Sequence, residues 1–246
     1  MATMALAQKG GAWLIEDTAP GDVVTPERLS DEHRLMARTA ADFVRQEVAP
    51  LREALEGKDW SVARRLVRRA GELGLLATDV PEEFGGLALD KISSVVVASE
   101  IAADASFGTT FGAITGLAIL PLVAFGTHDQ QQRYLPGLAS GEMVGAYCLS
   151  ESGSGSDALG ARTRATRLAD GSFSLSGEKM WITNAGFADV FIVFAKVDGE
   201  AFTAFIVERA FPGVSIGEEE HKMGLRASST ARSIRSVVRT SRLSST

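Results

Sequence analysis

Two short segments of the chain carry residue types from which a cofactor site could be built. The first, residues 147–157, reads Tyr-Cys-Leu-Ser-Glu-Ser-Gly-Ser-Gly-Ser-Asp and places two glycines and four serines directly after a predicted strand. Glycines let a backbone approach a ligand closely, and backbone N–H groups together with hydroxyls can hold an anionic or heteroaromatic group. The same composition is typical of a flexible linker, so the loop alone leaves both interpretations open.

The second segment, residues 179–185, reads Lys-Met-Trp-Ile-Thr-Asn-Ala. Trp181 could stack on a planar ligand, and the nearby hydroxyl of Thr183 could bond the edge of that ligand. A tryptophan in a β-rich region more often belongs to the core, so this segment is also ambiguous by itself.

A dinucleotide-binding fingerprint of the Rossmann type is the third interpretation, because Gly153, Gly155 and Ala158 have roughly its spacing. That fingerprint requires a helix directly after the glycines. Residues 162–168 and 173–175 have strand patterns instead, so we reject it.

The elements that would position these segments change type along the chain. Residues 25–140 have apolar side chains at helical spacing. We expect a first helix that begins at Thr25 or at Ser30 and is limited or bent by Pro50, and a second that begins near Asp59 and ends at Gly74. Three more helices are expected over 90–104, 110–125 and 127–136.

From residue 144 onward the pattern favours strands. We expect them over 144–149, 162–168, 173–177, 190–197, 202–207 and 214–216. The continuous apolar run 190–197 is typical of a strand buried on both faces. The fold class predicted from this order is α+β, with an N-terminal α-helical domain followed by a small β-barrel-like or β-sandwich domain.

Composition narrows the class of protein further. Hydrophobic residues make up 45% and charged residues 23%, as in soluble globular proteins, and a net charge of −6 argues against a nucleic-acid surface. The single cysteine and the three widely separated histidines predict neither a disulfide nor a metal site. The most apolar stretch, 113–125, is shorter than the ~20 residues of a membrane span. We therefore expect a cytoplasmic protein without a transmembrane segment.

Taken together, residues 147–157 and Trp181-Ile182-Thr183-Asn184 resemble the acyl-CoA dehydrogenase family. The resemblance extends over about residues 11–230, and it includes the segments 81–86, 131–142 and 223–230. Residues 10–17 and 89–92 are most similar to bacterial members of the long- and very-long-chain type.

The resemblance implies an organisation and an activity. It divides the chain into an N-terminal extension (1–24), a helical N-terminal domain (25–142), a flavin-binding middle β-domain (143–230) and an aberrant basic tail (231–246). Members bind FAD and introduce a trans-2 double bond into acyl-CoA thioesters in fatty acid β-oxidation. An electron-transfer flavoprotein is the expected electron acceptor, and a homodimer or homotetramer is expected for the full-length form.

The resemblance also implies roles for single residues. The cofactor-binding residues would be Tyr147, Leu149, Ser150, Gly155, Ser156, Trp181, Ile182 and Thr183, and Ser156 is also a candidate for contact with the CoA arm. Glu151 and Asp157 would orient the loop. No catalytic residue is expected within this chain, because the family's base belongs to a C-terminal four-helix domain.

The tail departs from the family pattern. After Glu220 the chain has no acidic residue, and residues 231–246 contain four arginines and five serines. We expect a truncation or frameshift near residue 231, with the C-terminal domain missing and the chain inactive by itself. A disordered basic tail, or an arm that binds nucleic acid or an anionic membrane, is the alternative.

The residues leave two alternatives for function. An acyl-CoA oxidase uses the same flavin chemistry but lets oxygen reach the reduced ring. The other is a shortened, non-catalytic protein that binds flavin or acyl-CoA. Activity measurements with and without oxygen would distinguish a dehydrogenase from an oxidase.

Overall fold

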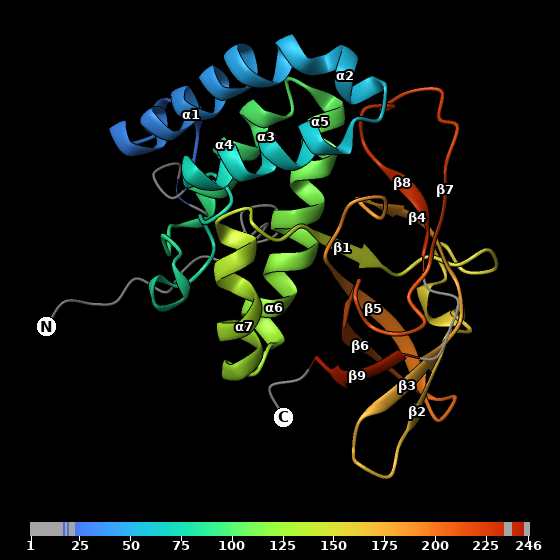
Figure 1. Cartoon of the computed structure of the whole chain (residues 1–246). Helices are drawn as coiled ribbons and strands as arrows, with labels where there is room; N and C mark the ends of the chain where they lie inside the picture. The colour runs from blue at the N-terminus through green and yellow to red at the C-terminus, as the bar shows by residue number, and fades with distance from the viewer. Residues whose placement is uncertain (1–16, 18, 20–22, 234–237, 244–246) are drawn as a thin grey trace, which may run out of the picture.

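Helices occupy the first half of the chain and strands the second half, and Figure 1 shows them as two adjoining layers. This computed structural model describes residues 17, 19, 23–233 and 238–243. The predicted extension 1–24 and the segment 10–17 therefore lie almost wholly outside the described residues. The α+β prediction, helical domain first and β-barrel-like domain second, is confirmed.

The helix starts follow the capping residues of the sequence. Helix α1 (Asp31–Phe43) begins after Ser30, whose hydroxyl accepts a hydrogen bond from the His33 backbone N–H at 3.1 Å, whereas Thr25 precedes only a 3-10 turn. A π-helical turn (Val44–Val48) and a 3-10 turn (Ala49–Leu51) lead into α2 (Arg52–Glu56). Helix α3 (Trp60–Glu72) is capped by Asp59, and Gly74 after it has φ +74°, where glycine is favoured.

Two predicted helix boundaries were wrong, one start and one end. The continuous helix formed by α5 (Ala105–Gly112), the π-helical segment η7 (Ala113–Ile119) and α6 (Leu120–Phe125) begins at Asp104 and not at residue 110, because Asp104 caps the Phe107 N–H at 3.0 Å. Helix α4 (Lys91–Ile101) ends just before it. Helix α7 (His128–Ala139) continues past Pro136, since Leu138 and Ala139 are buried and their packing outweighs the missing N–H.

The helix Ala105–Phe125 has the length and apolar composition of a membrane span, and 44% of its most apolar window is buried within the protein. Partly buried core helices of soluble proteins have the same composition. In this structure the helix packs against strand β1 on one side, where a Cβ atom at Gly145 would lie only 2.3 Å from the Cβ of Ala118. The helix is therefore part of the interior that joins the two layers.

The larger sheet has the strand order β1-β5-β2-β3-β9-β6, with β6 also paired to β5, so five of its strands close into a ring. The strands are β1 (Gly145–Cys148), β2 (Arg164–Arg167), β3 (Phe173–Ser176), β5 (Val190–Val197), β6 (Ala201–Glu208) and β9 (Val238–Arg242). Strand β5 is the predicted buried strand, and it pairs parallel with β1 and β2 and antiparallel with β6.

The tail contributes strands, contrary to the disordered alternative. Strand β8 (Thr230–Ser233) lies between β4 (Lys179–Thr183) and β7 (Ile216–Glu219) in a second, three-stranded sheet, and β9 closes the ring between β3 and β6. Strand β7 begins at the residue where the predicted strand 214–216 ends, because Val214 still belongs to the preceding turn. Residues 234–237 and 244–246 of the tail lie outside the described residues.

An ionic and aromatic seam joins the helical layer to the β-domain. The Arg64 guanidinium on α3 donates to both carboxylate oxygens of Asp189, at 3.0 and 3.1 Å, and to the Phe187 carbonyl at 2.7 Å. The Trp60 ring stacks on Phe187 with centroids 5.4 Å apart. These contacts hold α3 against the start of β5. Because β1 pairs with β5, they also fix the position of β1 relative to the helices.

Candidate functional site

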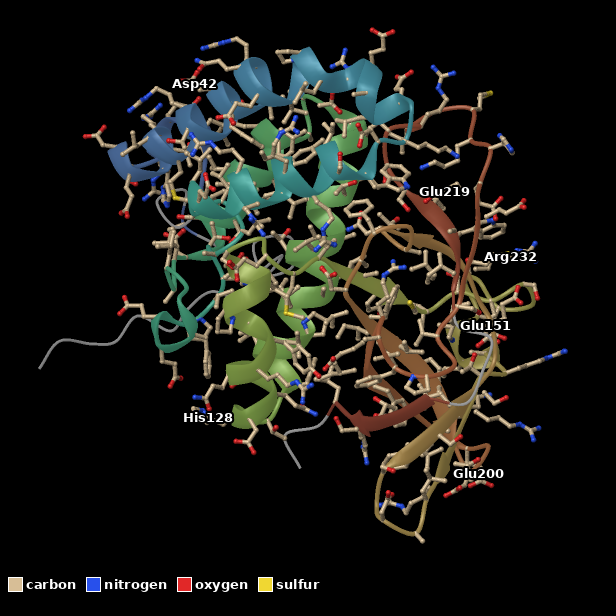
Figure 2. The ribbon with its side chains drawn as sticks, in the orientation of Figure 1. Asp42, His128, Glu151, Glu200, Glu219 and Arg232 are labelled. Atoms are coloured by element: carbon tan, nitrogen blue, oxygen red, sulfur yellow. The ribbon has the colours of Figure 1, made fainter. Side chains whose placement is uncertain are left out.

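The two segments singled out in the sequence lie against each other in the β-domain. The first leaves β1 at Cys148, and the second is β4. The Met180 backbone N–H donates to the Ser150 carbonyl at 2.9 Å, and Nζ of Lys179 donates to the Leu149 carbonyl at 2.9 Å. Figure 2 shows Glu151, the next residue of the loop, among the strands and away from α1. Segments about 30 residues apart in the sequence are therefore in direct contact in this region of the β-domain.

Trp181 is the most unusual residue of this region. Its φ is +58°, which bulky residues rarely adopt, and 61% of its surface is exposed. The register of β4 with β8 shifts between Lys179 and Ile182, so Trp181 sits on a bulge. Bulges re-aim side chains, and backbone strain of this kind concentrates at functional sites. The bulge turns a large flat ring outward instead of into the core.

The other predicted site residues fall into three groups. The Tyr147 ring is half-buried and lies 5.0 Å from Phe194, and burial raises the pKa of its phenol. The side chain of Ile182 is 2% exposed, so only its backbone is available to a ligand, while Thr183 is half-buried in β4. Leu149 and Ser150 are half-buried, and Gly155 and Ser156 are exposed on the loop, where a Cβ atom at Gly155 would meet nothing within 4 Å.

Glu151 is a buried structural carboxylate. It accepts hydrogen bonds from the backbone N–H groups of Arg162 and Thr163 at 2.6 and 3.0 Å, from the Thr163 hydroxyl at 2.5 Å, and from Lys179 at 2.8 Å. Burial raises its pKa, but Lys179 and the three other donors outweigh burial and lower the pKa of Glu151 from 4.5 to about 2. Burial lowers the pKa of Lys179, and the Glu151 carboxylate opposes that change.

Acid should therefore remove part of the stability of the fold. Because the pKa of Glu151 is lowered in the folded state, its contribution is fully present above about pH 5 and is lost as the pH falls toward 2. The full loss is on the order of 3 kcal/mol and is reached only below pH 2, so about 2 kcal/mol is expected between pH 7 and pH 3. Urea unfolding measured between pH 7 and pH 3 checks this. The double variant Lys179→Met/Glu151→Gln should lose less stability over this range, and an equal loss would contradict the assignment.

Asn184, the chain's only asparagine, ties the second segment to the helical layer. Its Nδ2 donates to the carbonyls of Thr110 on α5 and Gly145 on β1, both at 3.1 Å, and its side chain is fully buried. Its φ of +67° is a conformation that asparagine tolerates better than most residues. One amide group thus fixes the distance between β4, β1 and the helix that follows Asp104.

The opposite face of that helix borders an apolar cavity of about 320 Å³ between α4 and α5. Leu75, Val95, Ala98, Phe111 and Leu120 supply apolar walls. Gly112 and Gly116, one helical turn apart, also line it, and a Cβ atom at either would meet nothing within 4 Å. These two positions leave the cavity open because they carry no side chain. Its lining also includes the polar residues Asp79, Lys91 and Ser94, and it lies one helix away from Asn184.

Sequence reasoning identified the two segments but missed the residues that join them. It gave Lys179 and Asn184 no role. The signal for Lys179 was its position at the start of a strand that also carries the buried Ile182. The interpretation of Glu151 and Asp157 as loop-orienting residues agrees with their hydrogen bonds, since Asp157 accepts from the Gly160 N–H at 3.1 Å. Within the described residues, no group of three potential metal ligands occurs.

Comparison with known proteins identifies the two layers. The family model for the N-terminal domain of acyl-CoA dehydrogenases matches residues 30–142, and the model for the middle domain matches residues 146–236. A probable acyl-CoA dehydrogenase of Bacillus subtilis strain 168 is 53% identical over 224 residues, which are 91% of this chain and 38% of that protein.

Solved structures give the same result. The crystal structure of an acyl-CoA dehydrogenase from Bacillus anthracis complexed with FAD matches with a TM-score of 0.90 and 50% identity, covering 95% of this chain and 40% of the other. Butyryl-CoA dehydrogenase of Megasphaera elsdenii matches with a TM-score of 0.78 and 32% identity over 87% of this chain and 58% of the other. The chain thus spans between about two fifths and three fifths of these proteins, and, carrying their N-terminal and middle domains, it belongs to the acyl-CoA dehydrogenase family.

Proposed function

We propose that this chain is the N-terminal and middle portion of an FAD-dependent acyl-CoA dehydrogenase that introduces a trans-2 double bond into fatty acyl-CoA thioesters. The observation that carries the proposal is the joining of the two segments through Met180, directly before the exposed ring of Trp181. FAD, when bound, supplies the hydride acceptor for the β-carbon. The proposal is supported by the FAD complex of the Bacillus anthracis relative.

The residues present fit an isoalloxazine ring. An exposed indole on a bulged strand offers a flat apolar surface for stacking, and the half-buried Thr183 hydroxyl is one residue beyond the buried Ile182. We assign Tyr147, Leu149, Ser150, Ile182 and Thr183 to the ring, with Ile182 acting through its backbone. Gly155 and Ser156 are exposed on a loop whose backbone can approach phosphates or the CoA arm.

The described carboxylates of this region do not suit the removal of a proton from the substrate. Glu151 has a pKa of about 2 and is fully engaged by four donors, so it is too weak and too enclosed to act as a general base. Asp157 caps the short 3-10 turn η8 (Ala158–Gly160) through its own carboxylate. We therefore propose that the base comes from outside these two segments, and that the chain alone is inactive.

We propose that the cavity between α4 and α5 receives the distal part of a long acyl chain. Its apolar walls suit a hydrocarbon, and its volume lies near the lower end of small-molecule pockets, roughly 300–1,000 Å³. Side chains at Gly112 and Gly116 would fill it, so their absence favours long substrates over short ones. This supports the long-chain assignment. For the full-length form we also propose an electron-transfer flavoprotein as acceptor and a homo-oligomeric state.

Filling the cavity tests this substrate class. We expect Gly116→Leu to weaken binding of a sixteen-carbon acyl-CoA at least about tenfold, since several buried methylenes contribute about 0.8 kcal/mol each. Binding of a four-carbon acyl-CoA, which would not reach the cavity, should change less than about twofold. Calorimetric titration of both ligands measures this, and equal losses for the two chain lengths would contradict the proposal.

A further inference from the structure

One buried side chain connects the end of β1 to the start of β4. Lys179 opens β4 two residues before Trp181, and its Nζ donates to the Leu149 carbonyl at 2.9 Å and to Oε1 of Glu151 at 2.8 Å. Both acceptors belong to the segment that follows β1. The Met180 N–H bond to the Ser150 carbonyl, at 2.9 Å, lies directly beside these contacts.

The Glu151 carboxylate closes the base of the loop. The Glu151 backbone exchanges two hydrogen bonds with Ser154, at 2.9 and 3.1 Å, while the side chain accepts hydrogen bonds from the N–H groups of Arg162 and Thr163. Both ends of the loop that carries Gly155 and Ser156 are thus held at one carboxylate. Lys179 then ties that carboxylate to the strand of Trp181.

Stability alone is a weak reason for such a pair. The Lys179 side chain is fully buried and that of Glu151 is 8% exposed, so both groups have lost their water. Apolar residues of similar volume in place of a buried ion pair are often equally stable. Unlike apolar residues, the charged pair makes directional hydrogen bonds. The ammonium and the carboxylate together fix the positions of several donors and acceptors.

We propose that Lys179 and Glu151 are positioning residues for the cofactor, which set the spacing between the loop after β1 and the strand that presents Trp181. The inference rests on the proposed flavin-binding function of these two segments. Both side chains are buried, so they act through Leu149, Ser150 and Trp181 and not by contact with the cofactor.

Three variants separate positioning from plain stability: Lys179→Met, Glu151→Gln and the double variant. Two quantities are measured for each, the midpoint of urea unfolding and the dissociation constant for FAD by equilibrium dialysis up to millimolar FAD. The single variants each leave one buried group without its partner, so both quantities should worsen. The double variant leaves no unpaired charge, so its midpoint should recover partway toward that of the unchanged protein, although the new amide NH2 still faces the N–H donor of Arg162 or Thr163.

The decisive result is FAD binding by the double variant. The inference predicts that its affinity stays at least about tenfold weaker than that of the unchanged protein even though stability has partly recovered. If affinity recovers together with stability, the pair has only a structural role and the inference is wrong. Arg45→Met serves as the control, since Arg45 pairs with Asp42 on an exposed face of the helical layer, and it should alter neither quantity.

The same titrations distinguish this inference from the function on which it rests. If FAD binding to the unchanged protein is absent or insensitive to Trp181→Gly, the flavin assignment of the two segments fails. If binding depends on Trp181 but the double variant binds as tightly as the unchanged protein, only the positioning role of Lys179 and Glu151 fails.

Discussion

Asn184→Asp should destabilise the protein by about 3–5 kcal/mol at pH 7, although the two side chains have nearly the same shape. The change replaces the Nδ2 donor by an oxygen, which then faces the carbonyls of Thr110 and Gly145 at about the 3.1 Å of the present bonds. A fully buried carboxylate without a cationic partner carries the cost of an uncompensated charge. Urea unfolding of the two proteins measures the difference.

The pH dependence of this variant identifies the cause. The new carboxyl is destabilised in its charged form, so its folded-state pKa is raised, and the penalty should shrink as the pH falls and the group becomes protonated. Gln132→Glu makes the same chemical change on an exposed face of α7 and should stay within about 0.5 kcal/mol. A loss for Asn184→Asp no larger than this control would show that the two amide bonds do not hold the layers together.

Trp181→Gly should weaken FAD binding by about 10- to 100-fold, because stacking of a base or similar ring on an aromatic side chain contributes about 1–3 kcal/mol. Stability should be nearly unchanged or slightly higher. Glycine accepts the φ of +58° without strain, and the ring buries little surface in the fold. A residue that binds ligand at a cost to the fold has this combination of effects.

Trp181→Phe is the matched variant, since it keeps a flat ring on the same bulge. It should retain FAD affinity within about fivefold, with equilibrium dialysis as the measurement. A large loss of stability in Trp181→Gly, with unchanged FAD binding, would place the tryptophan in the packing of the β-domain and remove it from the site.

Local chemistry made much of the fold predictable. Ser30 and Asp59 mark helix starts through bonds that their own side chains make, and Gly74 marks a helix end through its φ. The run 190–197 pairs on both edges, and the side chains of 190–193 are fully buried. Asp104 was misread as a helix end because an acidic residue between two helical patterns can close one or cap the next, and only packing decides between them.

The pairing of strands that are distant in the sequence could not be predicted from the hydrophobic pattern. Strand β9 reads Val-Arg-Thr-Ser-Arg and has no apolar period of two, yet its backbone fills the gap between β3 and β6. Thr240 is buried there because its hydroxyl bonds the Ile206 carbonyl. The candidate site was found by its motifs, whereas the contacts of Lys179 and Asn184 depend on residues 28 to 74 positions away.

Amide hydrogen exchange with and without millimolar FAD tests the central claim most directly. The two segments form one flavin-binding face in this account, so FAD should slow exchange in both 149–157 and 180–184, while amides on the far helices α1 and α7 stay unchanged. Protection confined to other parts of the chain, or to only one of the two segments, would contradict it.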